Sequence, residues 1–323
     1  MPADAGPGQG MPAPDRHGQR ARRRGHLAML IYAGLVSGSF SLGALAAPHL
    51  EPASLNLLRF LLATALMGGL AAASGTLRRQ HGAGAWRYLL LGGLMAVFFV
   101  LMFEALLRTD PVSTGTVFTL IPAMAALFGW MVLRQRTTPR MAAALAVGAA
   151  GAVWVIFRGD WAGMLAFRVG TGEAIFVIGC AALALYAPLI PRLNRGEPPL
   201  VFTFGVLAGA TLWLGVTGAA GLTRVDLAAL PGVVWLAILY LAVLATSVSF
   251  FLQQFAALRL PAGTVMAYTY LVPSLVVLWE GLLGHGWAAA RILPGVALTA
   301  LALLALLAQP AAPAPLPSAG PNR

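Results

Sequence analysis

The chain has 323 residues, of which 59% are apolar and only 10% are charged, and its mean hydropathy is +0.81. Soluble domains are roughly 45–50% apolar and about 25% charged, so this composition excludes a soluble globular protein. The formal net charge of +11 comes entirely from arginine, and because the arginines lie between apolar runs, the charge indicates membrane topology and not nucleic-acid binding.

Residues 1–26 are rich in Pro, Gly and Ala and contain an arginine cluster at positions 20, 22, 23 and 24. This composition cannot bury apolar surface and predicts a disordered basic tail. The cluster, the following apolar run and the small residues Ala44-Leu45-Ala46 also fit a cleavable signal peptide, which we keep as an alternative.

Ten apolar runs follow the basic tail, and most are near the roughly 20 residues that a helix needs to cross a bilayer. They cover residues 27–48, 53–75, 88–107, 111–133, 141–157, 173–191, 200–221, 231–257, 261–284 and 289–308. Residues 309–323 are rich in Pro and Ala and predict a second disordered tail. We therefore expect an all-α integral membrane protein with ten transmembrane helices.

Arginine placement predicts the orientation, because cytoplasmic loops retain positive charge. With the amino terminus inside, 15 of the 21 arginines face the cytoplasm, 5 face outward and Arg59 lies within a helix. Both termini are thus predicted to be cytoplasmic. The helical spans and the lysine-free composition, rich in Ala, Arg and Gly, favour a multi-pass protein of a bacterial inner membrane.

The two halves of the sequence share residues at constant spacing. Ala105, Leu107, Arg108, Leu120 and Pro122 recur 151 positions later as Ala256, Leu258, Arg259, Leu271 and Pro273. The pair Glu51-Pro52 similarly recurs as Glu197-Pro198. Each half then holds five helices, over residues 27–157 and 171–308, and an odd number means that the second repeat enters the membrane inverted. Inverted repeats are typical of transporters.

The same segments carry a family resemblance. The stretches "ALLRTDPVSTGTVFTLIP" and "AALRLPAGTVMAYTYLVP", together with "LNLLRF" around Arg59, resemble EamA-type members of the drug/metabolite transporter superfamily. The resemblance implies a ten-helix carrier, often an exporter of amino acids or other metabolites. The glutamates that the family usually places after its fourth and ninth helices are absent, since this chain has Arg134-Gln135-Arg136 and Gly284-His285-Gly286 there.

Three charged residues fall inside predicted helices: Arg59, Glu104 and Glu280. A charge at the centre of a membrane helix costs at least roughly 2.5–3.5 kcal/mol, so each is a candidate functional residue. All three lie toward the outer side, which predicts a cluster in which Arg59 pairs with at least one glutamate. Such a cluster could form an outer gate or bind a zwitterionic substrate. An excess glutamate would make protons a candidate coupling ion. Alternatively, Glu104 pairs with Arg108 along its helix and Arg59 snorkels to the surface.

Uncharged polar residues, aromatic residues and prolines complete the candidate site. Thr246, Ser249 and Gln253 share one helix face and either line a cavity or join helices by hydrogen bonds. Aromatic residues that either wall a substrate pocket or pack in the core are Tyr186, Tyr268, Tyr270 and Trp279. Pro122 and Pro273 occupy equivalent positions, can kink their helices, and are predicted hinges.

No phosphate loop, zinc helix or nucleophile elbow is present in the sequence, and its single cysteine, Cys180, lies in an apolar run. We expect no catalytic residue, metal or cofactor. The sequence predicts a secondary transporter for a small organic metabolite or drug that works by alternating access, with export favoured over import. The alternatives are an intramembrane enzyme or a flippase acting on a lipid-linked substrate. Expected partners are the substrate and membrane lipids, with no nucleic acid, and the oligomeric state stays open.

Overall fold

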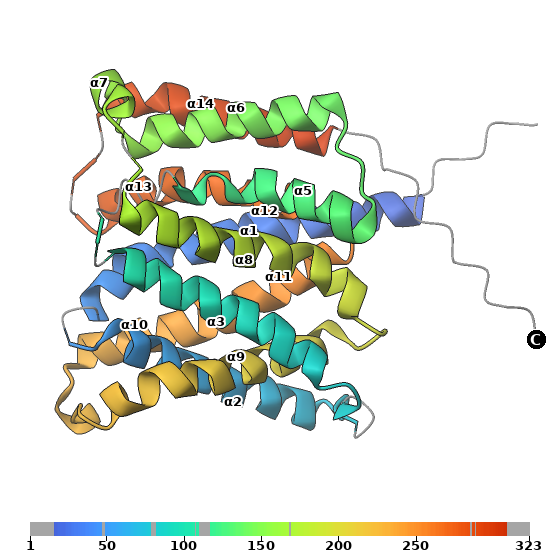
Figure 1. Cartoon of the computed structure of the whole chain (residues 1–323), viewed down its shortest axis with the longest axis vertical. Helices are drawn as coiled ribbons and strands as arrows, with labels where there is room; N and C mark the ends of the chain where they lie inside the picture. The colour runs from blue at the N-terminus through green and yellow to red at the C-terminus, as the bar shows by residue number, and fades with distance from the viewer. Residues whose placement is uncertain are drawn as a thin grey trace, which may run out of the picture.

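A computed structural model describes residues 16–46, 49–78, 82–106, 108–109, 117–167, 169–284, 286–287 and 289–308. Within these residues the regular structure is entirely helical, and the long helices run side by side (Figure 1). The predicted all-α fold is confirmed for this part of the chain. The predicted tail over residues 309–323 lies outside it.

The helices of the amino-terminal half are α1 (Arg16–Ala46), α2 (Pro52–Ala73), α3 (Trp86–Leu106), α5 (Ile121–Leu133), α6 (Pro139–Ile156) and the short α7 (Trp161–Leu165). Those of the carboxyl-terminal half are α8 (Thr171–Leu193), α9 (Pro199–Leu222), α10 (Gly232–Ala242), α11 (Ser249–Ala257), α12 (Ala262–Ala267), α13 (Val272–Leu282) and α14 (Leu293–Leu307). A π-helix, η3 (Val243–Val248), joins α10 to α11, and a 3₁₀-helix, η4 (Tyr268–Leu271), joins α12 to α13. Two further 3₁₀ turns are Leu227–Ala229 and Ala290–Ile292.

Eight helical stretches of the described chain are long and apolar enough to cross a membrane. The apolar parts of two more, Trp86–Met102 in α3 and Ile121–Leu133, are shorter. These ten stretches correspond in position to the ten predicted runs. The structure therefore supports a multi-pass membrane protein, and the number of ten crossings stays a prediction.

The predicted amino-terminal tail is wrong for residues 16–26, because α1 begins at Arg16. Alanine, arginine and glutamine are good helix formers, and this first part of α1 is also held by contacts. Arg22 lies 3.5 Å from the carbonyl oxygen of Leu306, and the His26 ring lies 2.9 Å from the Tyr268 hydroxyl. Since α1 packs against α10, α11 and α13, it is part of the fold, as expected of a retained membrane helix.

Pro122 and Pro273 each lie in the first turn of a helix, α5 and α13. The predicted helix 261–284 is therefore interrupted and not merely kinked, because η4 separates α12 from α13. Proline lacks an N–H and fits the first turn of a helix, where that N–H would have no partner within the helix. The run 231–257 is likewise divided, by the π-helix η3.

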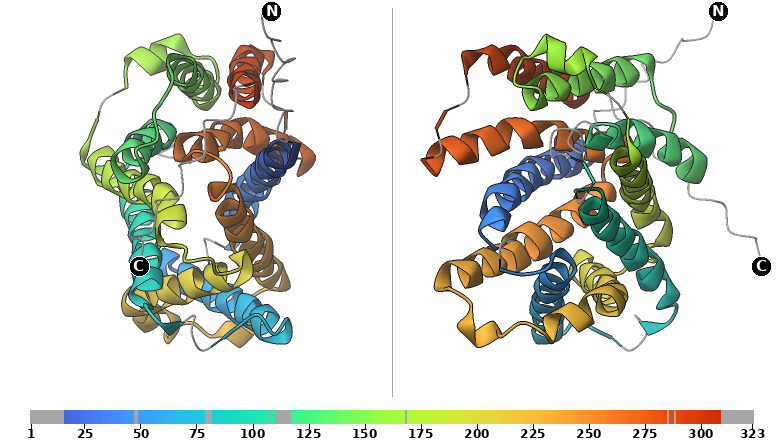
Figure 2. Two further views of the ribbon diagram at one scale, coloured as in Figure 1. Left: turned by 90° about the vertical axis from the view of Figure 1, so that its right-hand side faces the viewer. Right: turned by 60° about the vertical axis from the view of Figure 1, so that its left-hand side comes forward.

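The helices form two groups in which both halves of the chain mix. In the α8 group, α8 packs against α3 and α5, and in the α1 group, α1 packs against α10, α11 and α13. Figure 2 shows these groups on opposite sides of the molecule. The pairs α2·α9 and α6·α14 lie at its two ends (Figure 1). In the second pair, a Cβ added to Gly151 or Gly295 would meet the carbonyl oxygen of the other, so only glycine permits this approach.

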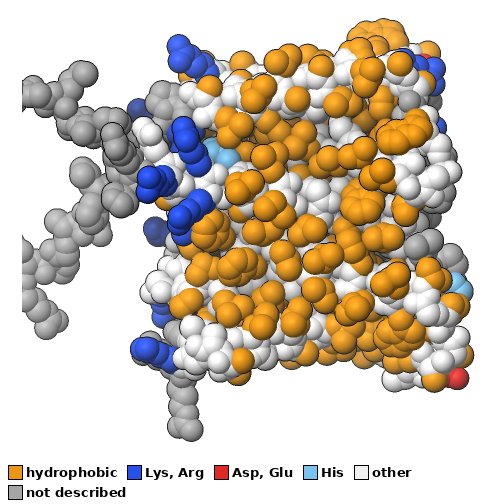
Figure 3. All heavy atoms as spheres, turned by 180° about the vertical axis from the view of Figure 1, so that it is seen from behind, with side chains coloured by type: hydrophobic (Ala, Val, Ile, Leu, Met, Phe, Trp, Pro, Cys, Tyr) orange, Lys and Arg blue, Asp and Glu red, His pale blue; other side chains and the backbone are white. Residues whose placement is uncertain are grey.

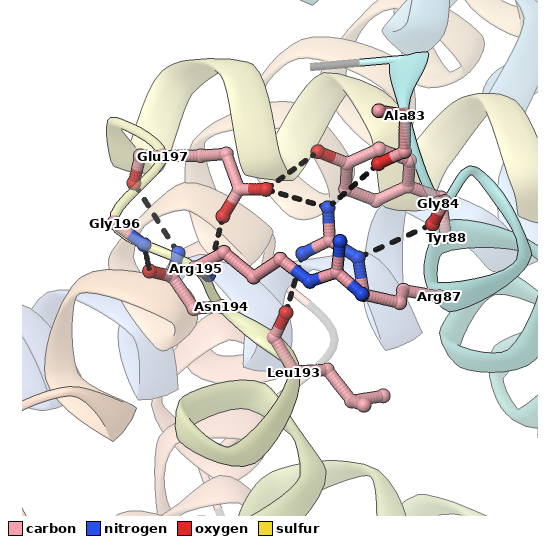
Figure 4. Close-up of polar contacts among 9 residues, drawn as sticks. All are labelled: Ala83, Gly84, Arg87, Tyr88, Leu193, Asn194, Arg195, Gly196 and Glu197. Carbon is pink, nitrogen blue, oxygen red and sulfur yellow. Dashed lines mark hydrogen bonds and ion pairs between the residues drawn. The ribbon is translucent and has the colours of Figure 1, made fainter. Parts of the chain in front are cut away.

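A buried ion pair connects the two halves. Arg87 at the start of α3 lies 2.7 Å from the Glu197 carboxylate, and the two side chains are only 2% and 5% exposed. Arg87 also donates to the Leu193 carbonyl oxygen at 2.5 Å, and the Arg195 N–H donates to Glu197 at 2.6 Å (Figure 4). The segment between α8 and α9 is thereby fixed to α3. In the sequence Arg87 is one of the 15 arginines on the predicted cytoplasmic side, and nothing there predicts its pairing with Glu197.

Hydrogen bonds from Arg87 and from the Arg195 backbone stabilise the ionised form of Glu197. Burial alone would raise the pKa of its carboxyl group, but the hydrogen bonds from Arg87 and from the Arg195 backbone outweigh burial and hold the pKa below its usual value. Glu197 is therefore ionised at neutral pH, and Arg87 keeps its counter-ion.

Replacement of Arg87 by leucine should destabilise the protein strongly, because it leaves Glu197 buried without a counter-ion. Breaking a buried ion pair in this way costs about 3–5 kcal/mol. The matched control is Arg108→Leu, which removes a pair whose two side chains are each 45% exposed and should cost less than about 1 kcal/mol. Denaturant unfolding in mild detergent measures both, and equal losses would contradict the importance of the Arg87–Glu197 pair.

Acid should weaken this pair in a predictable way. Because the pKa of Glu197 is lower in the folded than in the unfolded chain, the stabilisation is complete above the unfolded value of about 4.3 and is lost as pH falls through the folded value. The unfolding free energy of the native chain should therefore fall toward that of Glu197→Gln between about pH 5 and about pH 2. A constant difference between the two proteins across this range would contradict a depressed pKa.

Candidate functional site

Arg59 lies on α2 and is buried in the membrane part of the fold, with only 8% of its surface exposed. Its Nε donates a hydrogen bond to the Thr246 hydroxyl at 3.0 Å. The guanidinium carbon lies 4.9 Å from the centre of the Phe99 ring and 5.6 Å from that of Phe60. The charge is thus held between two phenyl rings and one hydroxyl group.

Thr246 is positioned by the π-helix η3. Its hydroxyl accepts from Arg59 and donates to the Leu241 carbonyl oxygen at 2.7 Å, five residues earlier. Ser247 makes the equivalent bond to Ala242 at 2.8 Å. Single π turns frequently occur at functional sites, and side-chain hydroxyls here bond to carbonyl groups of the wide turn. The turn places the Thr246 oxygen against α2.

The predicted ion pair between Arg59 and a glutamate is not formed among the described residues. Glu104 lies 2.5 Å from Arg108, one helical turn away, and both side chains are 45% exposed. The alternative i,i+4 pair is therefore confirmed, because the nearer arginine on the same surface satisfies this carboxylate. Glu280 lies half-buried on α13, and in the described chain no carboxylate lies within 4.0 Å of the Arg59 guanidinium.

The predicted polar stripe is buried, as expected of polar groups that avoid lipid. Ser249 donates to the Ala245 carbonyl oxygen at 2.8 Å, and Gln253 lies 4.0 Å from the Met266 sulfur. Next to the stripe, Gln254 donates to the hydroxyl of Tyr186 at 2.9 Å. Since Gln254 is on α11 and Tyr186 is on α8, this bond joins the α1 group to the α8 group.

The other predicted aromatic residues contact parts of the described chain other than Arg59. Tyr268 is bonded to His26, and Tyr270 lies against Gly148. Trp279 donates to the Gly34 carbonyl oxygen at 3.4 Å and packs against the Tyr240 ring. Two cavities of about 450 and 320 Å³ have other linings, the first around Trp130 and Arg136 and the second between α3 and α9. None of the predicted aromatic residues lines either of these cavities.

Asn56 lies three residues before Arg59 on α2 and is a buried polar residue that charge patterning does not reveal. It is only 1% exposed, and its Oδ1 has no hydrogen-bond partner in the structure. The signal was available in the motif "LNLLRF", because residues three apart share one helix face. Asn56, Arg59 and Thr246 together offer one cation and one unused acceptor in an apolar surrounding, which suits a polar organic ligand.

A metal site has no support among the described residues, where no three His, Cys, Asp or Glu side chains group together. Cys180 is buried in α8. The polar groups around Arg59 are therefore the chemistry that this region presents.

Comparison with known proteins places the fold. No curated protein matches the chain. A solved crystal structure, whose description states no function, superposes on this chain with a TM-score of 0.70 at 21% sequence identity. The match covers 88% of this chain and 96% of the other chain. At this identity it shows similarity of fold alone. Residues 23–157 match the EamA-like transporter family. This part of the chain is therefore similar to the EamA-like transporters of the drug/metabolite transporter superfamily.

Proposed function

We propose that this protein is a secondary transporter that exports a small organic metabolite across the cytoplasmic membrane by alternating access. One observation carries the proposal beyond the family match. Arg59 is a buried cation in an apolar region, and no carboxylate of the described chain neutralises it. A charged side chain within a membrane helix costs free energy, and such residues mark substrate or ion pathways.

The position of Arg59 supports a role in binding. A snorkelling arginine would carry its head group to the surface, whereas the Arg59 head group is enclosed and bonded to Thr246. Phe99 belongs to the α8 group, and Thr246 precedes α11 of the α1 group. Arg59 therefore contacts both groups, and a movement of one group against the other would change its surroundings.

The packing pattern supports two inverted repeats. If the five predicted helices of each half are exchanged, the α3·α8 contact becomes the α1·α11 contact, and α5·α8 becomes α1·α13. The pairs α2·α9, α6·α14 and α5·α12 become themselves. We propose that the two groups rock against each other, with the helix interruptions before Pro122 and Pro273 as paired hinges.

The distribution of arginine supports the proposed orientation. Most arginine side chains visible in Figure 3 gather at one end, and hydrophobic side chains cover the band between the two ends. The first turns of α1 and the last turn of α14 meet at the same end, as the Arg22–Leu306 contact shows (Figure 1). We propose that this end faces the cytoplasm, following the positive-inside rule.

The enzyme alternative has less support. It requires outer glutamates that are free for acid-base work on a lipid-linked substrate. Glu104 is instead paired with Arg108 on an exposed surface. We therefore retain transport as the function that the geometry supports best.

Loss of the Arg59 charge should slow transport. We expect Arg59→Gln to slow movement of the substrate in sealed vesicles at least about tenfold, because a hydrogen bond to a charged group contributes about 1.5–3 kcal/mol. Candidate substrates are a mixed panel of amino acids, other organic acids, amines, sugars and drugs. Glu104→Gln is the matched control and should transport normally. Equal rates for all three proteins, at equal membrane abundance, would remove the role of Arg59.

Thr246 should matter more than its neighbour. Thr246→Val keeps the side-chain volume but leaves the Arg59 Nε without its acceptor, so we expect transport to fall several-fold. Ser247→Ala removes the same kind of bond to the π-helix without touching Arg59, and it should retain transport. If both variants lose transport equally, the hydroxyl groups support the π-helix and do not position Arg59.

A further inference from the structure

A groove of about 320 Å³ lies between the first turns of α3 and the first half of α9. Its lining residues are apolar or glycine, and Tyr88 contributes the one polar side-chain group among them. Leu77, Leu89 and Leu212 belong to this lining and are exposed, so the groove opens on the outside of the helix bundle. An apolar groove in the outer surface of a membrane-spanning bundle is filled by lipid and not by water.

The length of the groove matches one leaflet of a bilayer. Its lining follows α9 from Val201 to Leu212, a rise of about 16 Å at about 1.5 Å per residue. Half of the hydrocarbon core of a bilayer is roughly 15 Å deep. Ala208 lies near the middle of this stretch, is half-buried, and its small side chain leaves the groove open. One acyl chain therefore fits along α9.

Two guanidinium groups share one carboxylate beside this groove. A Cβ added to Gly84 would lie 3.3 Å from Arg87 Nε and 3.2 Å from a terminal nitrogen of Arg195, so both groups meet at this glycine (Figure 4). The Glu197 Oε1 accepts from Arg87 and Tyr88, and its Oε2 accepts from the Arg195 backbone N–H. Within the described chain no carboxylate lies within 4.0 Å of the Arg195 guanidinium. Its positive charge, on an exposed side chain, is available to an anion.

The groove and the guanidinium groups are contiguous. Gly82 and Ala85 line the groove, and Gly84, against which both guanidinium groups lie, is between them in the chain. Figure 1 shows the starts of α1 and α3 at one end of the molecule, the end that we propose to face the cytoplasm. Basic pockets between membrane helices on the cytoplasmic side bind the head groups of anionic lipids. Charge and apolar surface are thus arranged as in a lipid of the inner leaflet.

We infer that the groove between α3 and α9 is a binding site for an anionic phospholipid. Arg195, supported by the neighbouring charge of Arg87, binds the phosphate, and one acyl chain lies along α9 against Leu89 and Leu212. A soluble phosphate lacks the chain, and a zwitterionic lipid brings its own cation to the phosphate, so both bind less well. The lipid contacts α3, α9 and the segment before α9, and its binding therefore stabilises their packing. This site is separate from Arg59 and does not depend on which substrate is transported.

Thermal unfolding of the purified full-length chain in a neutral detergent tests the inference. Phosphatidylglycerol is added at rising mole fraction and low ionic strength, where charge attraction is least screened. It is compared with phosphatidylcholine of the same two acyl chains and with glycerol 3-phosphate, which has no acyl chain. We expect phosphatidylglycerol to raise the unfolding temperature by several degrees and to saturate, because a ligand that binds the folded state stabilises it. The other two compounds should give much smaller shifts.

Variants separate the head-group contact from the groove. Arg195→Gln should raise the mole fraction of phosphatidylglycerol that gives half of the shift at least about fivefold, and Arg195→Lys should recover part of this loss. The matched control is Arg140→Gln, which removes an exposed arginine at the start of α6, in the α6·α14 pair on the other side of the molecule from α9. It should respond to lipid as the native chain does. Ala208→Leu fills the groove and should weaken the effect of phosphatidylglycerol several-fold without lowering the unfolding temperature in lipid-free detergent.

The inference is wrong if phosphatidylglycerol produces no shift, or if the Arg195→Gln and Arg140→Gln proteins respond equally. An equal shift with phosphatidylcholine would mean that the groove takes any lipid, and an equal shift with glycerol 3-phosphate would mean that the ligand is a soluble phosphate. A folded Ala208→Leu variant with native lipid affinity would contradict an acyl chain in the groove. A dimer in detergent that Ala208→Leu converts to a monomer would assign the groove to a second copy of this chain instead.

Discussion

The cost of an uncompensated charge in an apolar environment limits where the charged side chains of the helices can lie. Arg87 is stabilised by the Glu197 carboxylate and by carbonyl oxygens at one end of the bundle. Glu104 forms an ion pair with Arg108 at an exposed surface. Arg59 alone among these residues is enclosed with only a hydroxyl group and two phenyl rings. The first two arrangements contain their own counter-ions, whereas the third has no carboxylate partner within the described part of the chain.

The helical fold could be predicted from the sequence because a membrane helix requires a long apolar run, and such runs are visible without any knowledge of packing. Details that depend on local hydrogen bonds were less accessible. The π-helix η3 depends on Thr246 and Ser247 bonding to carbonyl groups five residues back, which hydropathy does not reveal. Pro273 was recognised as a site of bending, but the separate η4 turn before it depends on packing around Tyr268 and Tyr270. The early start of α1 depends on contacts with Leu306 and Tyr268, which both belong to the second half.

Among the candidate site residues, Arg59 and the buried face of Thr246, Ser249 and Gln253 could be identified from charge and spacing alone. The partner of Arg59 could not, because depth along a helix says nothing about the direction in which a side chain points. Glu104 and Arg59 have similar predicted depths, yet Glu104 turns to Arg108, two residues beyond the end of α3. Asn56 was overlooked because an asparagine in an apolar run carries no charge to attract attention. Its significance lies in a single buried oxygen without a partner, which only the structure shows.

The mixing of the two halves has a consequence for how the protein is made. Ribosomes deliver α1, α2, α3, α5 and α6 to the membrane before any residue of α8 exists. The main partners of α1 and α3 are α11 and α8, and the counter-ion of Arg87 is Glu197, all of which are synthesised later. The newly inserted first half therefore waits in the bilayer with its interfaces unfilled and Arg87 unneutralised. Its assembly into a compact bundle must therefore follow insertion of the second half.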